Sequence, residues 1–118
     1  MAIPSGSGTE VLKNSISQHG GTGESAILTG VANHIYTVIS IIIYNDTSTA
    51  HDFNLYIDKQ LAGTDYRLMS GSGSTIAGYA TFVWNDRFVM TGTDKLLCTS
   101  GSGSDFEFIC SYIDQDWT

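Results

Sequence analysis

Basic residues are scarce in this chain. Its 118 residues include 5 lysines and arginines against 12 aspartates and glutamates, which gives a formal charge of -7 and a pI near 4.5. A protein that binds nucleic acid through the phosphate backbone needs a basic face that releases counterions. The charge balance therefore argues against nucleic acid as a partner.

Long apolar runs are also missing. The longest, Val38–Tyr44, is interrupted by Ser40 and is far shorter than the roughly 20 residues that a helix needs to cross a bilayer. The first ten residues carry neither the basic nor the apolar segment of a secretory signal. We therefore expect a protein that is made and folded in the cytoplasm and has no membrane partner.

Cysteine and histidine are too few and too scattered for a metal site. Cys98 and Cys110 stand twelve residues apart, and His19, His34 and His51 show no zinc-ligand spacing with them. Without an export signal, the reducing cytoplasm favours free thiols over a disulfide. We expect two buried free cysteines, a structural role for His34, and neither metal nor cofactor.

The acidic residues near the C-terminus do not form a recognisable catalytic or calcium-binding motif. Asp105, Glu107, Asp114 and Asp116 are close in sequence, but the glycine and downstream glutamate of a calcium loop are absent. A solvated acidic edge is the favoured interpretation. The adjacent pair at positions 51 and 52 points to opposite faces of a strand, so it forms no catalytic dyad. We expect no catalytic residue and no enzyme.

Proline occurs once, whereas glycine occurs 13 times, a balance that favours many turns. Runs of four to nine residues rich in Val, Ile, Phe, Tyr and Thr alternate with polar turns, which is typical of antiparallel hairpins, most clearly in residues 80–118. His34–Tyr44 is apolar enough to predict a central strand buried on both faces. About eight such strands predict an all-β protein: a single-domain antiparallel β-sandwich over residues 25–118, with jelly-roll topology.

Residues 1–24 are rich in glycine and serine and predict an extended N-terminal arm outside the sandwich. Its apolar residues Ile3, Val11 and Leu12 are candidate contacts to a partner on which the arm becomes ordered. Trp117, close to the C-terminus, is a fourth candidate, because aromatic residues are enriched at interfaces. The alternative, that Trp117 caps its own sandwich, is equally compatible with the sequence.

Four segments carry a resemblance to a known family: Met1–Lys13, Gly30–Ile41, Phe82–Leu96 and Ser111–Thr118. They resemble small virion structural proteins of tailed bacteriophages. The resemblance extends over most of the chain and includes no catalytic signature. It implies a non-enzymatic protein of the virion, made in the host cytoplasm.

Within that family, the resemblance favours a head decoration or cement protein on the outer surface of the capsid. Its partner would then be the major capsid protein, and a homo-oligomer, with a trimer favoured, is implied. A tail, neck or fibre-adaptor protein is the main alternative. A carbohydrate-binding module for host attachment is a further one, with Tyr44, Tyr56, Tyr79 or Trp84 as stacking platforms.

Overall fold

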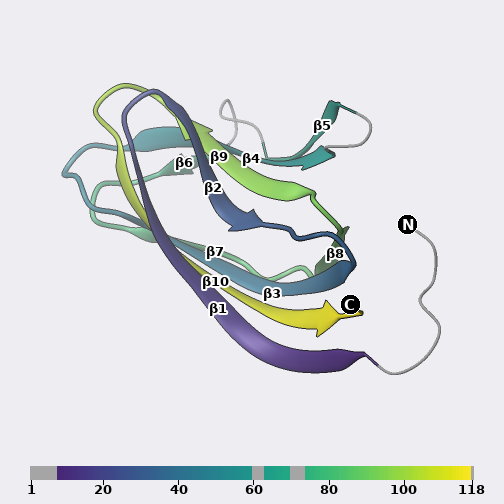
Figure 1. The fold of residues 1–118 in the computed structure, drawn as a ribbon. Helices are drawn as coiled ribbons and strands as arrows, with labels where there is room; N and C mark the ends of the chain where they lie inside the picture. Colours follow the sequence, from purple (N-terminus) through teal and green to yellow (C-terminus); the bar gives the residue numbers. More distant parts are fainter. Residues whose placement is uncertain (1–7, 60–62, 70–73, 118) are drawn as a thin grey trace.

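The computed structural model describes residues 8–59, 63–69 and 74–117, and their regular structure consists of strands (Figure 1). The strands are β1 (Thr9–Gly20), β2 (Gly23–Thr29), β3 (His34–Asn45), β4 (His51–Lys59), β5 (Thr64–Met69), β6 (Thr75–Ile76), β7 (Thr81–Trp84), β8 (Phe88–Thr91), β9 (Lys95–Ser100) and β10 (Asp105–Asp116). No helix among the described residues is long and apolar enough to cross a membrane.

Two antiparallel sheets lie face to face (Figure 1). The first, called here the β3 sheet, has the order β1-β10-β3-β7, and β8 also pairs with β3, along Ile35–Val38, whereas β7 pairs along Ile41–Tyr44. The second, the β4 sheet, has the order β2-β9-β4-β5, with β6 also pairing β4. Consecutive strands mostly lie in opposite sheets, and the first strand lies beside the last, as in a jelly roll. The predicted all-β antiparallel sandwich with jelly-roll topology is confirmed.

The hairpin pairing predicted for residues 80–118 is wrong. β7 and β8 both pair with β3, β9 pairs with β2 and β4, and β10 pairs with β1 and β3. Turn residues specify that the chain reverses, but they do not specify which strand it then meets. The turns after β8 and β9 carry the chain across the roughly 10 Å between the two sheets, whereas the turn between β7 and β8 leaves both strands beside β3.

Most of the predicted arm that the structure describes belongs to the sheets. β1 pairs with β10 along its whole length, from Thr9 opposite Asp116 to Gly20 opposite Asp105, and β2 begins at Gly23. The sequence conceals this strand because β1 is an edge strand with mostly exposed side chains, so its backbone bonds to β10 hold it without an alternating apolar pattern. Residues 1–7, which include Ile3, lie outside the described residues.

The core fills the space between the sheets. β3 runs through the middle of its sheet, as predicted, but only one of its faces is fully buried, and the other is half-buried. A bulge opposite the step from Ser111 to Tyr112 turns both Ile39 and Ser40 away from the core. The largest fully buried side chains are Phe53, Phe106, Phe108, Ile27, Ile41, Ile43, Leu55, Met90, Leu96 and Val38.

Candidate interaction surface

Three of the four predicted contact residues come together at one end of the sandwich. Val11 and Leu12 occupy successive positions of β1 and point to opposite sides of the strand, with 49% and 70% of their surface exposed. Trp117 follows the last residue of β10, which pairs with the start of β1. We call Val11, Leu12 and Trp117 the terminal group. Ile3, the fourth candidate, falls outside the described residues.

Trp117 packs against its own chain. Its backbone N–H donates to the carbonyl of Asn33 at 3.0 Å, and its ring lies so close to Gly8 that a Cβ there would come within 2.8 Å of the indole. The indole N–H is buried and meets no acceptor among the described residues. Trp117 therefore packs in part on its own chain, and the residue as a whole is half-buried.

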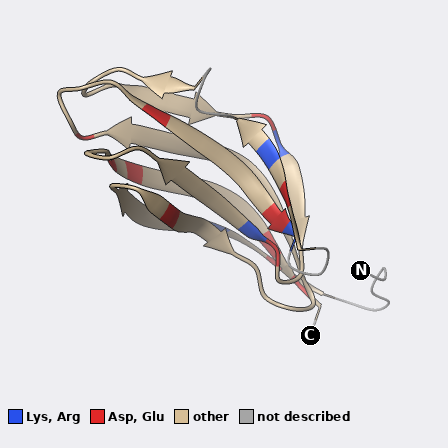
Figure 2. Ribbon diagram, turned by 90° about the horizontal axis from the view of Figure 1, so that it is seen from above, with Lys and Arg blue, Asp and Glu red and all other residues tan. Residues whose placement is uncertain are grey.

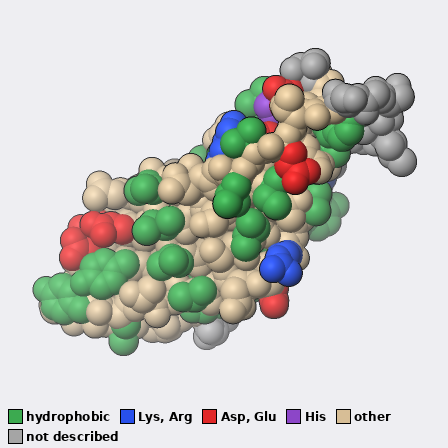
Figure 3. Space-filling model, turned by 90° about the horizontal axis from the view of Figure 1, so that it is seen from below, with side chains coloured by type: hydrophobic (Ala, Val, Ile, Leu, Met, Phe, Trp, Pro, Cys, Tyr) green, Lys and Arg blue, Asp and Glu red, His purple; other side chains and the backbone are tan. Residues whose placement is uncertain are grey.

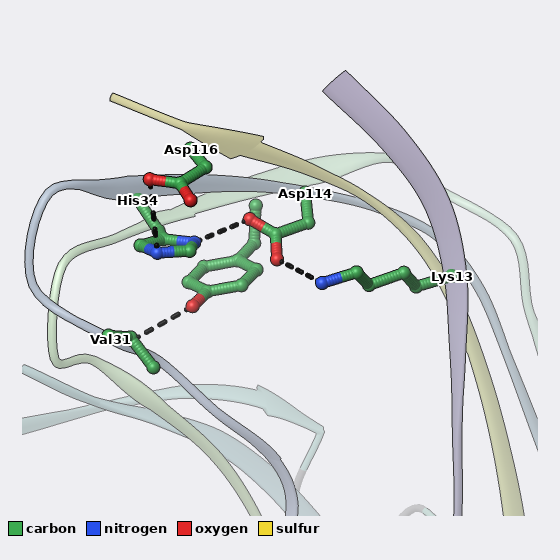
Figure 4. Close-up of polar contacts among 6 residues, drawn as sticks. Lys13, Val31, His34, Asp114 and Asp116 are labelled. Carbon is green, nitrogen blue, oxygen red and sulfur yellow. Dashed lines mark hydrogen bonds and ion pairs between the residues drawn. The ribbon is translucent and has the colours of Figure 1, made fainter. Parts of the chain in front are cut away.

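A polar cluster lies next to the terminal group and joins three strands (Figure 4). Asp114 of β10 accepts hydrogen bonds from Lys13 Nζ of β1 at 2.8 Å and from His34 Nδ1 of β3 at 2.7 Å. His34 Nε2 lies 3.5 Å from a carboxylate oxygen of Asp116. His34 is thus a structural histidine, as predicted. The prediction of a solvated acidic edge is wrong for Asp114, which is buried. The sequence does not show that two hydrogen-bond donors, Lys13 and His34, lie on the neighbouring strands.

The pKa of Asp114 reflects this pairing. Burial by itself raises the pKa of the carboxyl group, but the hydrogen bonds from Lys13 and His34 and their electrostatic attraction outweigh it, so the pKa lies below its usual value of 3.8. Asp114 is therefore ionised at neutral pH and fastens β10 to both of its neighbours in the sheet.

A second buried histidine sits at the other end of β1. His19 Nδ1 lies 2.7 Å from the hydroxyl of Ser25, and its Nε2 lies 2.7 Å from the hydroxyl of Ser100, so the ring joins β1 to β2 and β9. Burial lowers the pKa of His19. From the sequence, His19 was expected in the extended N-terminal arm. Nothing in the sequence indicates that Ser25 and Ser100 are its hydrogen-bond partners.

The outer face of the β3 sheet carries two apolar rows that cross four strands. The pairing register places Leu12, Ile113, Thr37 and Val89 side by side in one row, called the terminal row. It places Ile16, Ile109, Ile42 and Val83 side by side in a second row, called the central row. Asn14, Ser111 and Ser40 lie between the rows.

Figure 3 views the molecule from the side of the β3 sheet, and hydrophobic side chains are spread over this face. Ile16, Val83 and Val89 are among the most exposed, with 71%, 52% and 56% of their surface accessible. A hollow of about 310 Å³ opens beside the central row, lined in part by Ile16, Ile42 and Ile109. Sequence reasoning missed this face. The available signal was β10, in which Ile109 and Ile113 are apolar on the side opposite the core residues.

Lys13, His34, Asp114 and Asp116 gather in one cluster, but their contacts with one another join neighbouring strands of the sheet. In the part of the chain that the structure describes, no group of three or more His, Cys, Asp or Glu residues is arranged to hold a metal ion. Asp52, which was considered as a catalytic partner of His51, accepts a hydrogen bond from the hydroxyl of Thr75. The exposed apolar surfaces, rather than a polar cleft, are therefore the candidate functional surfaces.

Comparison with known proteins identifies the fold and not the family. No family model and no curated protein sequence matches the chain. A chain of the Bacillus endospore appendages, described as disulfide-linked pili, aligns with a TM-score of 0.59 and 14% identity over 100% of this chain and 97% of its own length. A chain of the T13 IBDV viral particle aligns with a TM-score of 0.59 and 6% identity over 92% of this chain, which spans only 31% of that larger chain.

A chain of the capsid asymmetric unit of cyanophage Pam1 aligns with a TM-score of 0.45, at 14% identity, over 98% of this chain and 92% of that one. This score is too low to bear on the argument. At the identities of the two stronger matches, the comparison establishes a shared sandwich fold and nothing about partners or activity.

The cysteines set this chain apart from what is said of the pili. Both Cys98 and Cys110 are free and fully buried, as predicted, and burial raises the pKa of each thiol to about 12. At neutral pH such thiols are protonated and unreactive. Neither thiol of the folded chain is therefore accessible for a disulfide to another molecule.

The four aromatic residues considered for carbohydrate binding do not share a surface. Tyr56 is buried and donates a hydrogen bond to Glu24 in the β4 sheet. Tyr44 lies on the outer face of the β3 sheet, opposite Glu107, whereas Trp84 pairs with the buried Ile41. Tyr79 is exposed in a turn. These four rings therefore do not form one common stacking platform.

Proposed function

We propose that this chain is a non-enzymatic structural protein of a bacteriophage virion, which binds the outer surface of the capsid as a decoration or cement protein. Its fold is one that also occurs in a viral particle and in a surface appendage, both of which are protein assemblies. The resemblance of the four sequence segments to virion proteins of tailed phages supports the same role.

The observation that carries the proposal is the terminal group. Val11 and Leu12 leave both sides of the β1 end apolar and exposed, next to the partly exposed ring of Trp117. Lys13, His34 and Asp114 fix the strands beneath this surface, so it is presented without further ordering. An apolar surface on a rigid support suits binding to the major capsid protein.

A decoration protein of this kind stabilises the shell by mass action, because it binds the assembled capsid and not its separated subunits. The family resemblance favours a trimer on the shell. In that arrangement, each copy directs its terminal group, together with Ile3, toward the capsid protein.

The copy number of the protein in purified virions tests the proposal. Quantitative mass spectrometry against the major capsid protein should give a stoichiometric ratio, since a decoration protein occupies sites repeated over the whole shell. A handful of copies per particle would contradict it and would favour the alternative of a tail, neck or fibre-adaptor protein.

A binding assay with shells that lack the protein tests the surface. Leu12→Asp should abolish binding because it places a charge in the apolar contact. Tyr66→Asp makes a similar change at an exposed residue of β5, in the other sheet, and should leave binding intact. Equal binding by the two variants would exclude the terminal group as the contact.

A further inference from the structure

We propose that the outer face of the β3 sheet is the contact between two copies of this chain, placed face to face about a two-fold axis. The face consists of the terminal row and the central row with the polar residues between them. It shares Leu12 with the proposed capsid contact, but the other seven residues of the two rows lie outside the terminal group, and both rows continue to Val83 and Val89, on the strands farthest from β1.

The size of the face suits a second copy. Together with the positions that flank the two rows, the outer face has four strands about 4.8 Å apart and about eight residues of roughly 3.4 Å each along them, which cover on the order of 500 Å². Two such faces together remove on the order of 1,000 Å² from solvent, without counting the extra area of protruding side chains. This total reaches the lower range of specific protein interfaces. The hollow beside Ile16 and Ile109 adds depth that a side chain of the second copy can fill.

The pattern of the face is complementary to itself. The two-fold axis lies in the plane of the contact. If it runs along the strands, each row packs on the same row of the second molecule. If it runs across the strands, the terminal row of one molecule packs on the central row of the other. Both arrangements place apolar rows on apolar rows. They also place the row of Asn14, Ser111 and Ser40 on its own copy, where amide and hydroxyl groups can hydrogen-bond in pairs.

Charge selects the face through which two acidic molecules can meet. The two rows, with Asn14, Ser111 and Ser40 between them, include no charged side chain. Charged residues lie at the margin of the face: Glu10 and Glu107 at its opposite ends, and Asp86 and Arg87 at its β7–β8 edge. A partner that recognised the formal charge of -7 would need basic groups, and the interior of this face offers them no acidic counterpart. A second apolar face of the same size matches it without an unpaired charge.

Sedimentation equilibrium of the full chain tests the proposal in the absence of any capsid. The chain should have twice its mass of 12.7 kDa at concentrations well above micromolar. Added salt should tighten the association, because it screens the repulsion between two acidic copies but leaves an apolar contact intact. A monomer, a trimer, or an association that salt weakens would overturn the proposal.

Matched valine variants locate the contact. Val83→Asp with Val89→Asp should raise the dissociation constant by about 100-fold or more, because each copy then buries carboxylates without partners. Val31→Asp is the control: Val31 is 54% exposed, similar to the other two, but it lies in the turn between β2 and β3. Equal dissociation constants for the face variant and the control would overturn the proposal.

Two further variants guard against loss of folding. Val83→Thr with Val89→Thr keeps the branched shape that strands accept and should weaken the dimer by a smaller factor. Ser111→Cys near the centre of the face should cross-link to its own copy through a short bismaleimide, since the native thiols are buried. Tyr66→Cys, on β5, should remain uncross-linked. Folded variants that neither weaken nor cross-link the dimer would overturn the proposal.

Discussion

Asp114 is buried, yet it ties together three strands. Its two carboxylate oxygens accept from Lys13 and from His34, and Lys13 reaches the site from the strand on one side while His34 reaches it from the other. A buried carboxylate stabilises a fold only while it is ionised and paired. Asp114, which the sequence predicted to be solvated, therefore makes the stability of this end of the β3 sheet depend on pH.

We expect Asp114→Asn to lower the free energy of unfolding at pH 7 by about 2 kcal/mol, because Lys13 and His34 lose a charged acceptor. The pKa of Asp114 is lower in the folded chain than in the unfolded chain, so its stabilisation is complete above the unfolded pKa, near 3.8. It is lost as the pH falls through the folded pKa. Chemical denaturation across this range should show the two proteins converging in acid.

The matched control is Asp105→Asn, which removes an exposed carboxylate from the other end of β10 and should change stability by less than about 0.5 kcal/mol. A difference between wild type and Asp114→Asn that persists unchanged in strong acid would mean that the charge of Asp114 is not what stabilises the sheet.

At the scale of elements, the jelly roll depends on close approach between turns. Gly30, which follows β2, donates its N–H to the carbonyl of Asp94, ahead of β9, at 2.8 Å. A Cβ on Gly30 would lie 2.1 Å from the carbonyl oxygen of Gly92 and 2.6 Å from that of Asp94. The two turns can touch in this way only because Gly30 has no side chain.

Gly30→Ala should therefore destabilise the protein by about 3 kcal/mol or more, since backbone atoms on both sides must move. Denaturant unfolding monitored by circular dichroism measures the loss. Gly101→Ala is the control, because no heavy atom lies within 4 Å of its added Cβ and its backbone is compatible with alanine. Equal stability of the two variants would show that the turns separate at little cost.

The edge strand β1 illustrates why element boundaries were harder to predict than element type. In residues 34–58, apolar side chains reveal strands because those strands face the core. β1 is held by backbone bonds to β10, with Ser15 donating to the carbonyl of Ile27 and His19 contacting two serines. Such bonds leave no periodic trace in a sequence, so glycine and serine suggested an arm.

At the scale of the molecule, charge is unevenly placed. In Figure 2, acidic residues appear toward both ends of the ribbon, whereas basic residues appear only in the half nearer the two termini. Lys13 and Lys59, two of the five basic residues, are paired with Asp114 and Asp94. The remaining excess of acid keeps copies apart at a distance and leaves apolar faces as the surfaces on which association can occur.

Because the first strand lies beside the last, we expect the whole fold to depend on β1. A chain of residues 21–118 should lose cooperative unfolding and aggregate, since β10 would expose an unpaired edge along twelve residues. A chain of residues 8–118 keeps every described contact and should melt within a few degrees of the full chain. Thermal unfolding and size-exclusion chromatography measure both. A stable, monomeric 21–118 would instead favour the arm predicted for residues 1–24.

The fold class was predictable, and the candidate surfaces only in part. Strand propensity, turn residues and the single proline indicated an antiparallel sandwich, and Val11 and Leu12, which the sequence suggested as contacts, are exposed. Ile16, Val83 and Val89 escaped notice because the sequence does not show that their side chains point to the same face. They become a surface only when the register places them on one face.

By itself, the sequence determined the all-β class, the acidic charge and the central place of β3, because each follows from composition or from local periodicity. Only the tertiary structure decided which strands pair, that Thr9–Gly20 is part of a sheet, and that Asp114 is buried against Lys13 and His34. Those outcomes rest on contacts between residues that are distant in sequence, as when β1 meets β10. Local propensity indicates that a strand forms, but it does not indicate which strands will pair with it or which of its faces will be buried.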